Sequence, residues 1–144
     1  MRLTGNQSFF ELQLIGVQYG QQANDPPLLE VAVRSGWHQR RSAGIGTLLH
    51  TNEVVHLIDW LRQAGKPHTL IPRLLFSDAS LAFDCVTADV DECLLQVKLD
   101  QELTPAWHLN SLLPFWIPLL TKRQAIFQAA DELQQQFYRL VGKE

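Results

Sequence analysis

The stretch that decides the fold class is SLAFDCVTADVDECLLQVKL, residues 80–99. Two runs rich in apolar residues, Ser80–Thr87 and Glu92–Leu99, flank the polar turn Ala88–Asp91. Two such runs around a short turn are typical of a β-hairpin. The stretch therefore predicts antiparallel strand pairing.

The same pattern recurs on the N-terminal side of this hairpin. In Ser8–Tyr19, Phe10, Leu12 and Leu14 alternate with more polar residues, which indicates a half-buried strand, and Gly16 marks a bulge. A loop rich in turn-forming residues follows at Gly20–Pro27. Further strands are expected at Leu28–Gln39, Arg40–Thr47 and Thr69–Phe76.

Two segments have helical periodicity instead. Thr51 is placed to cap a helix whose apolar residues recur at Val54, Leu57, Ile58 and Leu61, and which ends before Gly65. Thr121, with Gln124 three residues later, has the spacing of a capping box for a last helix. The buried stripe of that helix is predicted to include Ile126, Ala130, Leu133 and Phe137.

Strands dominate the first two thirds of the chain, and the helices do not alternate with them. We therefore expect an α+β fold in a single domain, residues 1–144, with a largely antiparallel sheet and two helices, about 51–64 and 121–141, packed against it. The segment 105–118 contains three prolines and several large apolar residues, so we expect an irregular arm lying over the sheet.

Composition excludes several classes of protein. The chain has 144 residues and a net charge of −3, from 12 Lys and Arg against 15 Asp and Glu. A general nucleic-acid binder needs a clear excess of basic residues. The sequence has neither an apolar run long enough to span a membrane nor a signal-peptide pattern at Met1–Gln7, so we expect a cytoplasmic protein that contacts neither nucleic acid nor membrane.

The sequence offers little for catalysis. Its five histidines lack metal-ligand spacing, and its serines lack a nucleophile-elbow motif. Cys85 and Cys93 are expected to be small core residues, with a redox pair as the alternative. We therefore expect no enzyme activity, no metal and no cofactor.

Negative charge gathers in the middle of the chain. Residues 51–104 carry nine acidic against four basic residues. This acidic segment is either a solvated sheet face or a surface that binds a basic partner. The candidate partner-binding residues are Asp78, Asp84, Asp89, Asp91, Glu92 and Asp100, together with Trp37, which lies beside two arginines.

Three stretches together resemble the WapI-type immunity protein family of bacterial polymorphic toxin systems. They are the opening FELQLIGVQY at 10–19, the helix VVHLIDWL at 54–61 continued by FSDASLAF at 76–83, and WIPLLTKRQ at 116–124. The first is an opening strand that ends in an aromatic residue and is followed by a polar loop containing Asp25, and the last enters a helix with Ala129, Ala130 and Leu133. Pro26-Pro27 and Ala79-Ser80 depart from the family pattern, which indicates a divergent member.

The resemblance implies a bacterial protein that inhibits a cognate toxin domain, often a nuclease, by binding and occluding it. Two alternatives stay open. One is a small enzyme or ligand-binding domain with a crevice near Trp107 and Trp116. The other is a structural subunit, a homodimer for example, whose apolar arm 105–118 docks a second copy.

Overall fold

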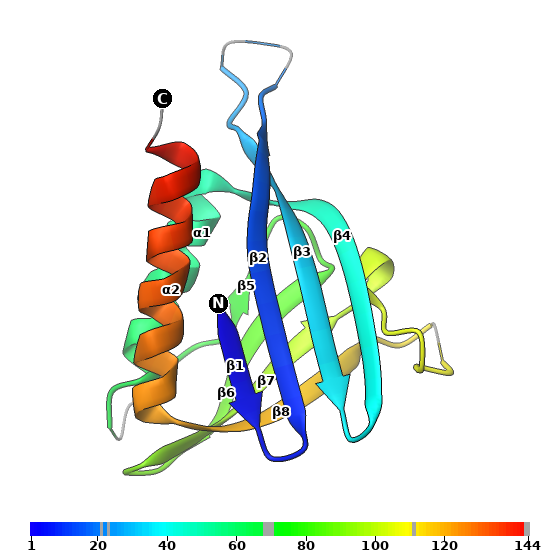
Figure 1. Ribbon diagram of the computed structural model, residues 1–144, viewed down its shortest axis with the longest axis vertical. Helices are drawn as coiled ribbons and strands as arrows, with labels where there is room; N and C mark the ends of the chain where they lie inside the picture. The colour runs from blue at the N-terminus through cyan, green and yellow to red at the C-terminus, as the bar shows by residue number, and fades with distance from the viewer. Residues whose placement is uncertain (21, 23, 68–70, 111, 143–144) are drawn as a thin grey trace.

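A computed structural model describes residues 1–20, 22, 24–67, 71–110 and 112–142. The strands form two antiparallel four-stranded sheets, β1-β2-β3-β4 and β5-β6-β7-β8 (Figure 1). The elements in chain order are β1 (Arg2–Gly5), β2 (Ser8–Gln18), β3 (Leu28–Trp37), β4 (Arg40–His50), α1 (Thr51–Ala64), β5 (Leu74–Leu75), β6 (Leu81–Ala88), β7 (Glu92–Leu99), η1 (Gln101–Leu103), β8 (Phe115–Lys122) and α2 (Arg123–Val141). The predicted α+β class is confirmed.

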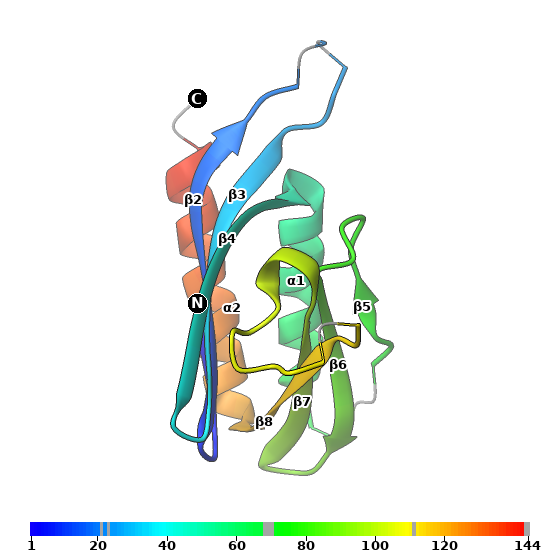
Figure 2. The same cartoon turned by 90° about the vertical axis from the view of Figure 1, so that its right-hand side faces the viewer.

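The helix α1 separates the four strands of the first sheet from the four strands of the second along the chain. Each sheet has one apolar face, and the two faces pack toward each other. Phe10 of β2 meets Phe83 of β6 edge to face, with ring centroids 5.5 Å apart. Figure 2 shows the β1–β4 sheet edge-on, with the β5–β8 sheet to its right. The buried residues of both sheets and both helices form one hydrophobic cluster.

Strand β2 follows the predicted alternation. Phe10, Leu12 and Leu14 are buried, and the register shifts between Leu14 and Gly16, which confirms the predicted bulge. Strand β1 was not predicted, because four residues with Leu3 as their one large apolar side chain give no periodic signal. The pairing of β1 with β2 supplies the hydrogen bonds that stabilise it.

Helix α1 has the predicted bounds, but its cap differs. Thr51 is the first helical residue and His50 is the N-cap. The backbone N–H of His50 donates to the Glu53 carboxylate at 3.0 Å. The acidic residue of the first turn thus accepts the hydrogen bond of the N-cap residue, as in one half of a capping box. The helix ends at Ala64, as Gly65 predicted.

The arm expected at 105–118 is irregular only in its first part. Its last residues belong to β8, which pairs with β7 from Leu99↔Phe115 to Glu92↔Lys122. Strand β8 is at the edge of its sheet, where Pro118 is tolerated because an edge strand leaves some N–H groups unpaired. The predicted strand Thr69–Phe76 is reduced to β5, and its residues 69–70 lie outside the described part of the chain.

The predicted capping box at Thr121 is wrong. Thr121 lies in β8, opposite Cys93, and its hydroxyl donates to the carbonyl oxygen of Thr4 at 3.3 Å. Helix α2 therefore begins at Arg123 with Lys122 as its N-cap. In the predicted stripe, Ile126, Ala130 and Leu133 are fully buried. Phe137 is only partly buried, at the edge of the core. Within the described residues, neither helix is apolar enough over a sufficient length to cross a bilayer.

Candidate partner-binding site

The turn between β6 and β7 carries three of the predicted acidic residues. The N–H of Asp89 donates to the carbonyl of Glu92 at 2.8 Å, which closes the turn. The Asp89 carboxylate also accepts from the N–H of Val90 at 2.8 Å. Asp89 and Asp91 are exposed and Glu92 is half-buried. We call Asp89, Asp91 and Glu92 the acidic turn.

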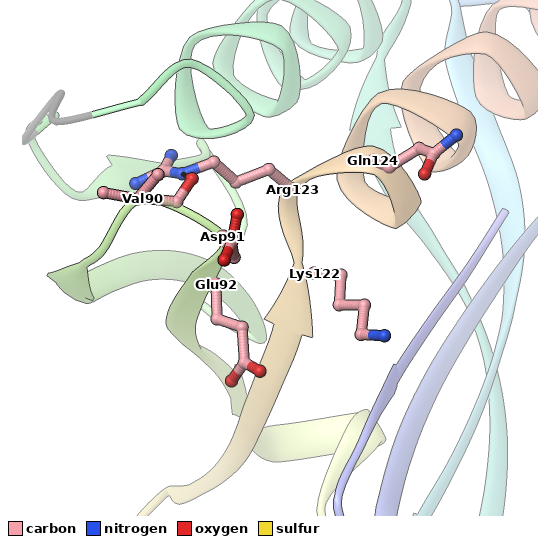
Figure 3. Close-up of a pocket in the computed structure, with 6 residues that line it drawn as sticks. All are labelled: Val90, Asp91, Glu92, Lys122, Arg123 and Gln124. Atoms are coloured by element: carbon pink, nitrogen blue, oxygen red, sulfur yellow. Dashed lines mark hydrogen bonds between the residues drawn. The ribbon is translucent and has the colours of Figure 1, made fainter.

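Arg123 holds the acidic turn from beneath. Its side chain extends to Val90, while Glu92 points away from it (Figure 3). Its Nε donates to the carbonyl oxygens of Asp89 at 2.6 Å and Val90 at 2.9 Å, and its Nη2 also binds the Asp89 carbonyl. The backbone N–H of Arg123 donates to the carbonyl of Asp91 at 3.0 Å. The turn is therefore attached to the first residue of α2 by side chain and backbone.

The same guanidinium binds the end of α1. Nη1 donates to the carbonyl of Ala64 at 3.0 Å and to that of Lys66. Carbonyl groups at a helix C-terminus carry partial negative charge, so a cation there is favourable. Arg123 is 5% exposed, and its fork of donors is used on backbone carbonyls from two separate segments.

Arg123 therefore does not use the carboxylates of the acidic turn as acceptors. Ion pairs between described residues do not include Asp89, Asp91 or Glu92. A cleft of about 470 Å³ adjoins the turn and is lined by Val90, Asp91, Glu92, Lys122, Arg123 and Gln124. The buried cation beneath the turn binds main-chain oxygen and leaves the carboxylates on the surface.

The other predicted acidic residues lie elsewhere. Asp84, in the middle of β6, forms an ion pair with Arg73 at 3.2 Å. Asp78 and Asp100 lie at the end of β6 and β7 that is remote from the turn, and each accepts from a nearby backbone N–H: Asp78 from Ser80 at 2.8 Å and Asp100 from Gln101 at 2.9 Å. The structure thus does not gather the six acidic residues into one cluster.

The outer face of the β5–β8 sheet joins these places. On β7, Cys93, Leu95, Val97 and Leu99 are buried, so the alternate residues from Glu92 to Asp100 face outward. Leu120 of β8 is 49% exposed on this face, opposite Leu94. The surface therefore mixes carboxylates with apolar side chains.

The sequence as a whole matches one protein family. The model of the immunity protein WapI-like family matches residues 2–140, nearly the whole chain. The chain belongs to the WapI-like immunity protein family. No curated protein and no solved structure matches it. The resemblance predicted from the sequence is confirmed, and membership implies a toxin protein as the partner and a role in immunity.

Trp37, the aromatic residue among the predicted partner-binding residues, is partly buried. It ends β3 and packs against Phe115, with ring centroids 5.5 Å apart, and against His38 at 4.6 Å. Phe115 pairs with Leu99, so Trp37 lies near the Asp100 end of β7 and away from the acidic turn. Its contacts indicate a packing role.

Trp107 and Trp116, predicted as the border of a crevice, lie on opposite faces of β8. Trp107 packs against Phe115 with ring centroids 5.8 Å apart, and Phe115 shares its strand face with buried Ile117. Trp116 faces the other way, and the guanidinium of Arg73 lies 4.8 Å from its ring. The two indoles therefore do not line one ligand site.

The two cysteines are free and buried in the WapI-like fold, as the sequence indicated. The register pairs Cys85 with Leu95 and Cys93 with Ala88, so the cysteines are offset and not directly opposite. Burial, with Cys93 adding to it, raises the pKa of the Cys85 thiol to about 11. A thiol that stays protonated is a poor nucleophile. Across the described ranges, His, Cys, Asp and Glu side chains form no group of three that suits a metal ion.

Sequence reasoning missed two features of this surface. Arg123 gave no signal, because one arginine at the start of a helix looks like any surface cation. The other is the loop before β8, where Leu109 is 97% and Leu112 is 92% exposed. Leu112 was expected to lie over the sheet, and its exposure shows that this expectation is wrong.

Proposed function

We propose that this protein neutralises a cognate toxin domain by binding it, and that the acidic turn is the centre of the contact. Family membership supports a toxin as the partner. The observation that carries the proposal is the arrangement at Arg123, which fixes the main chain of the turn and leaves three carboxylates without an ion pair among the described residues. A rigid charged surface binds at a smaller entropic cost than a flexible one.

The charge of the turn favours a toxin with a basic functional surface, such as a nuclease. A nuclease binds phosphates through basic residues, and carboxylates presented on a turn compete for the same residues. The apolar side chains beside the turn, Val90 and Leu120, are 53% and 49% exposed and supply area that is released from water in the complex. Binding there occludes the toxin without any chemical step.

The test is a binding measurement with the cognate toxin domain, sought as the variable C-terminal domain of a large secreted repeat protein encoded beside this chain. The triple variant Asp89→Lys, Asp91→Lys, Glu92→Lys is compared with a matched reversal of three exposed carboxylates outside the turn, Asp25→Lys, Asp59→Lys, Glu102→Lys. We expect the first triple to slow association and to change the sign of its salt dependence, because salt screens the attraction of the parent protein but the repulsion of the variant, over about 10 Å at 0.1 M salt.

The matched reversal changes net charge by the same amount, so it separates a local contact from a general effect of charge. If both triples associate with the toxin domain as fast as the parent protein and still protect cells, the acidic turn is only a solvated surface. If both slow association equally, net charge and not the turn governs the encounter.

A second candidate function is self-association through the loop before β8. Leu109 and Leu112 are almost fully exposed, and burial of a leucine side chain contributes about 1.5–3 kcal/mol. We propose that a second copy covers them if the protein acts as a structural subunit. Gel filtration over a hundredfold concentration range tests this, with Leu109→Ser, Leu112→Ser as the monomeric comparison. A constant monomer volume for the parent protein contradicts it.

A further inference from the structure

The outer face of the β1–β4 sheet carries arginines from three strands. In one row of paired residues, Arg2 of β1 lies opposite Glu11 of β2, which lies opposite Arg34 of β3. In the next row on the same face, Phe9 of β2 pairs with Gly36 of β3, and Gly36 pairs with Arg41 of β4. We call Arg2, Arg34 and Arg41, around Phe9, the arginine face.

Phe9 organises this face because Gly36 leaves room for its ring. A Cβ at Gly36 would lie 2.3 Å from Cε1 of Phe9, so the ring lies directly over the glycine. The guanidinium of Arg2 is 4.3 Å from the ring centroid and that of Arg41 is 6.0 Å from it. Cation–π contacts of this kind restrain arginine side chains without using their hydrogen-bond donors.

The arginine face carries more positive charge than its one paired carboxylate, Glu11, neutralises. Glu11 faces both Arg2, at 3.3 Å, and Arg34, at 4.0 Å, so one carboxylate serves two guanidinium groups. The side chains of these arginines are 52% and 61% exposed. Arg41 is exposed, and the ion pairs between described residues do not include it. Arg2, Arg34 and Arg41 against Glu11 leave a local charge of +2 in a chain whose net charge is −3, and Glu30 lies further along β3 on the same face.

We propose that the arginine face is a second interaction surface, which binds a carboxylate-rich segment of a protein. Arginine presents a planar fork that matches a carboxylate with two hydrogen bonds. Ile45 of β4, 61% exposed on the same face, adds apolar area of the kind that protein interfaces bury. A single-stranded nucleic acid is less favoured, because the Phe9 ring on which a base would stack is already covered by Arg2.

This surface lies on a different sheet from the acidic turn, so it does not depend on the proposed toxin contact. The test uses two labelled probes of equal length in fluorescence anisotropy: a decaglutamate peptide and a ten-nucleotide oligothymidylate. The double variant Arg34→Gln, Arg41→Gln is compared with Lys66→Gln, Arg139→Gln, which removes the same charge from exposed positions near the helix ends. Circular dichroism verifies that both variants fold.

We expect the peptide to bind the parent protein, and the arginine-face variant to bind it about tenfold more weakly, with binding reduced further as salt screens the charges. The matched control keeps the parent affinity. Absence of peptide binding, an equal loss in both variants, or tighter binding of the oligonucleotide than of the peptide overturns the proposal. None of these results bears on the acidic turn, whose own test uses the toxin domain.

Discussion

Arg123 binds Asp89 through its backbone: the guanidinium Nε lies 2.6 Å from the Asp89 carbonyl oxygen. A buried arginine next to an aspartate usually pairs with the carboxylate, and here the carboxylate accepts from the N–H of Val90 instead. The cation therefore stabilises the turn without neutralising it. The Asp89 carboxylate thus differs from that of Asp84, which forms an ion pair with Arg73.

Replacement of Arg123 by methionine tests that structural role. We expect the free energy of unfolding in urea to fall by about 3 kcal/mol or more, because several buried carbonyls lose a charged donor together. The free energy of unfolding of Arg123→Lys should lie between those of the parent protein and Arg123→Met. A lysine ammonium keeps the charge, but it lacks the guanidinium donors that bind the turn and the end of α1 together. Arg139→Met, at an exposed site in the last turn of α2, is the control. A loss below about 1 kcal/mol for Arg123→Met contradicts the role.

Glu53 connects two segments in a similar way. Its side chain is buried, and it accepts from the N–H of His50 at 3.0 Å and from the N–H of Ser77 at 2.7 Å. Glu53→Ala leaves both donors unpaired, so we expect a loss of about 1–3 kcal/mol in a urea melt. Glu53→Gln retains one acceptor oxygen and should cost less. Equal stability of all three proteins would mean that water replaces the carboxylate.

The C-terminal helix offers a graded test of packing. Leu133 is fully buried, whereas Phe137 lies at the edge of the core. Leu133→Ala should cost about 2–5 kcal/mol, the range for emptying a closed core site. Phe137→Ala should cost less than the 3–5 kcal/mol typical of a fully buried aromatic residue. The reverse order in denaturant melts would show that Phe137 carries more of the core than its exposure indicates.

The buried thiol of Cys85 predicts a pH dependence of stability. The pKa of Cys85 is raised from its ordinary 9.0 to about 11, mainly by burial, so the folded protein retains a proton that the unfolded chain loses. Between about pH 9 and pH 11 the unfolded state binds fewer protons, and the free energy of unfolding should fall as the pH rises. Cys85→Ala should flatten that slope. Urea melts at pH 8 and pH 10.5 measure the difference, and an unchanged slope in the variant argues against Cys85 as its source.

Local sequence determined the elements whose signals lie within a few residues. Helix α1 spans Thr51–Ala64 and strand β7 spans Glu92–Leu99, as their periodicity and flanking turn residues predict. These signals work because hydrogen bonding within a helix and the alternation of side chains along a strand depend on neighbouring residues. Family membership also followed from the sequence, since patterns in the same order cover nearly the whole chain.

Only the tertiary structure decided how those elements combine. The division of the strands into two sheets, the strand position of Thr121 and the pairing of β1 each depend on partners distant in the chain. The same holds for the site: the acidic residues were visible in the sequence, but their division between the turn and the far end of β6 and β7 was not. Arg123 took its role because folding brings the end of α1, the turn and the start of α2 together. A buried cation is tolerated only where its donors are paired. Here carbonyls from several segments converge on Arg123, and no local pattern encodes that convergence.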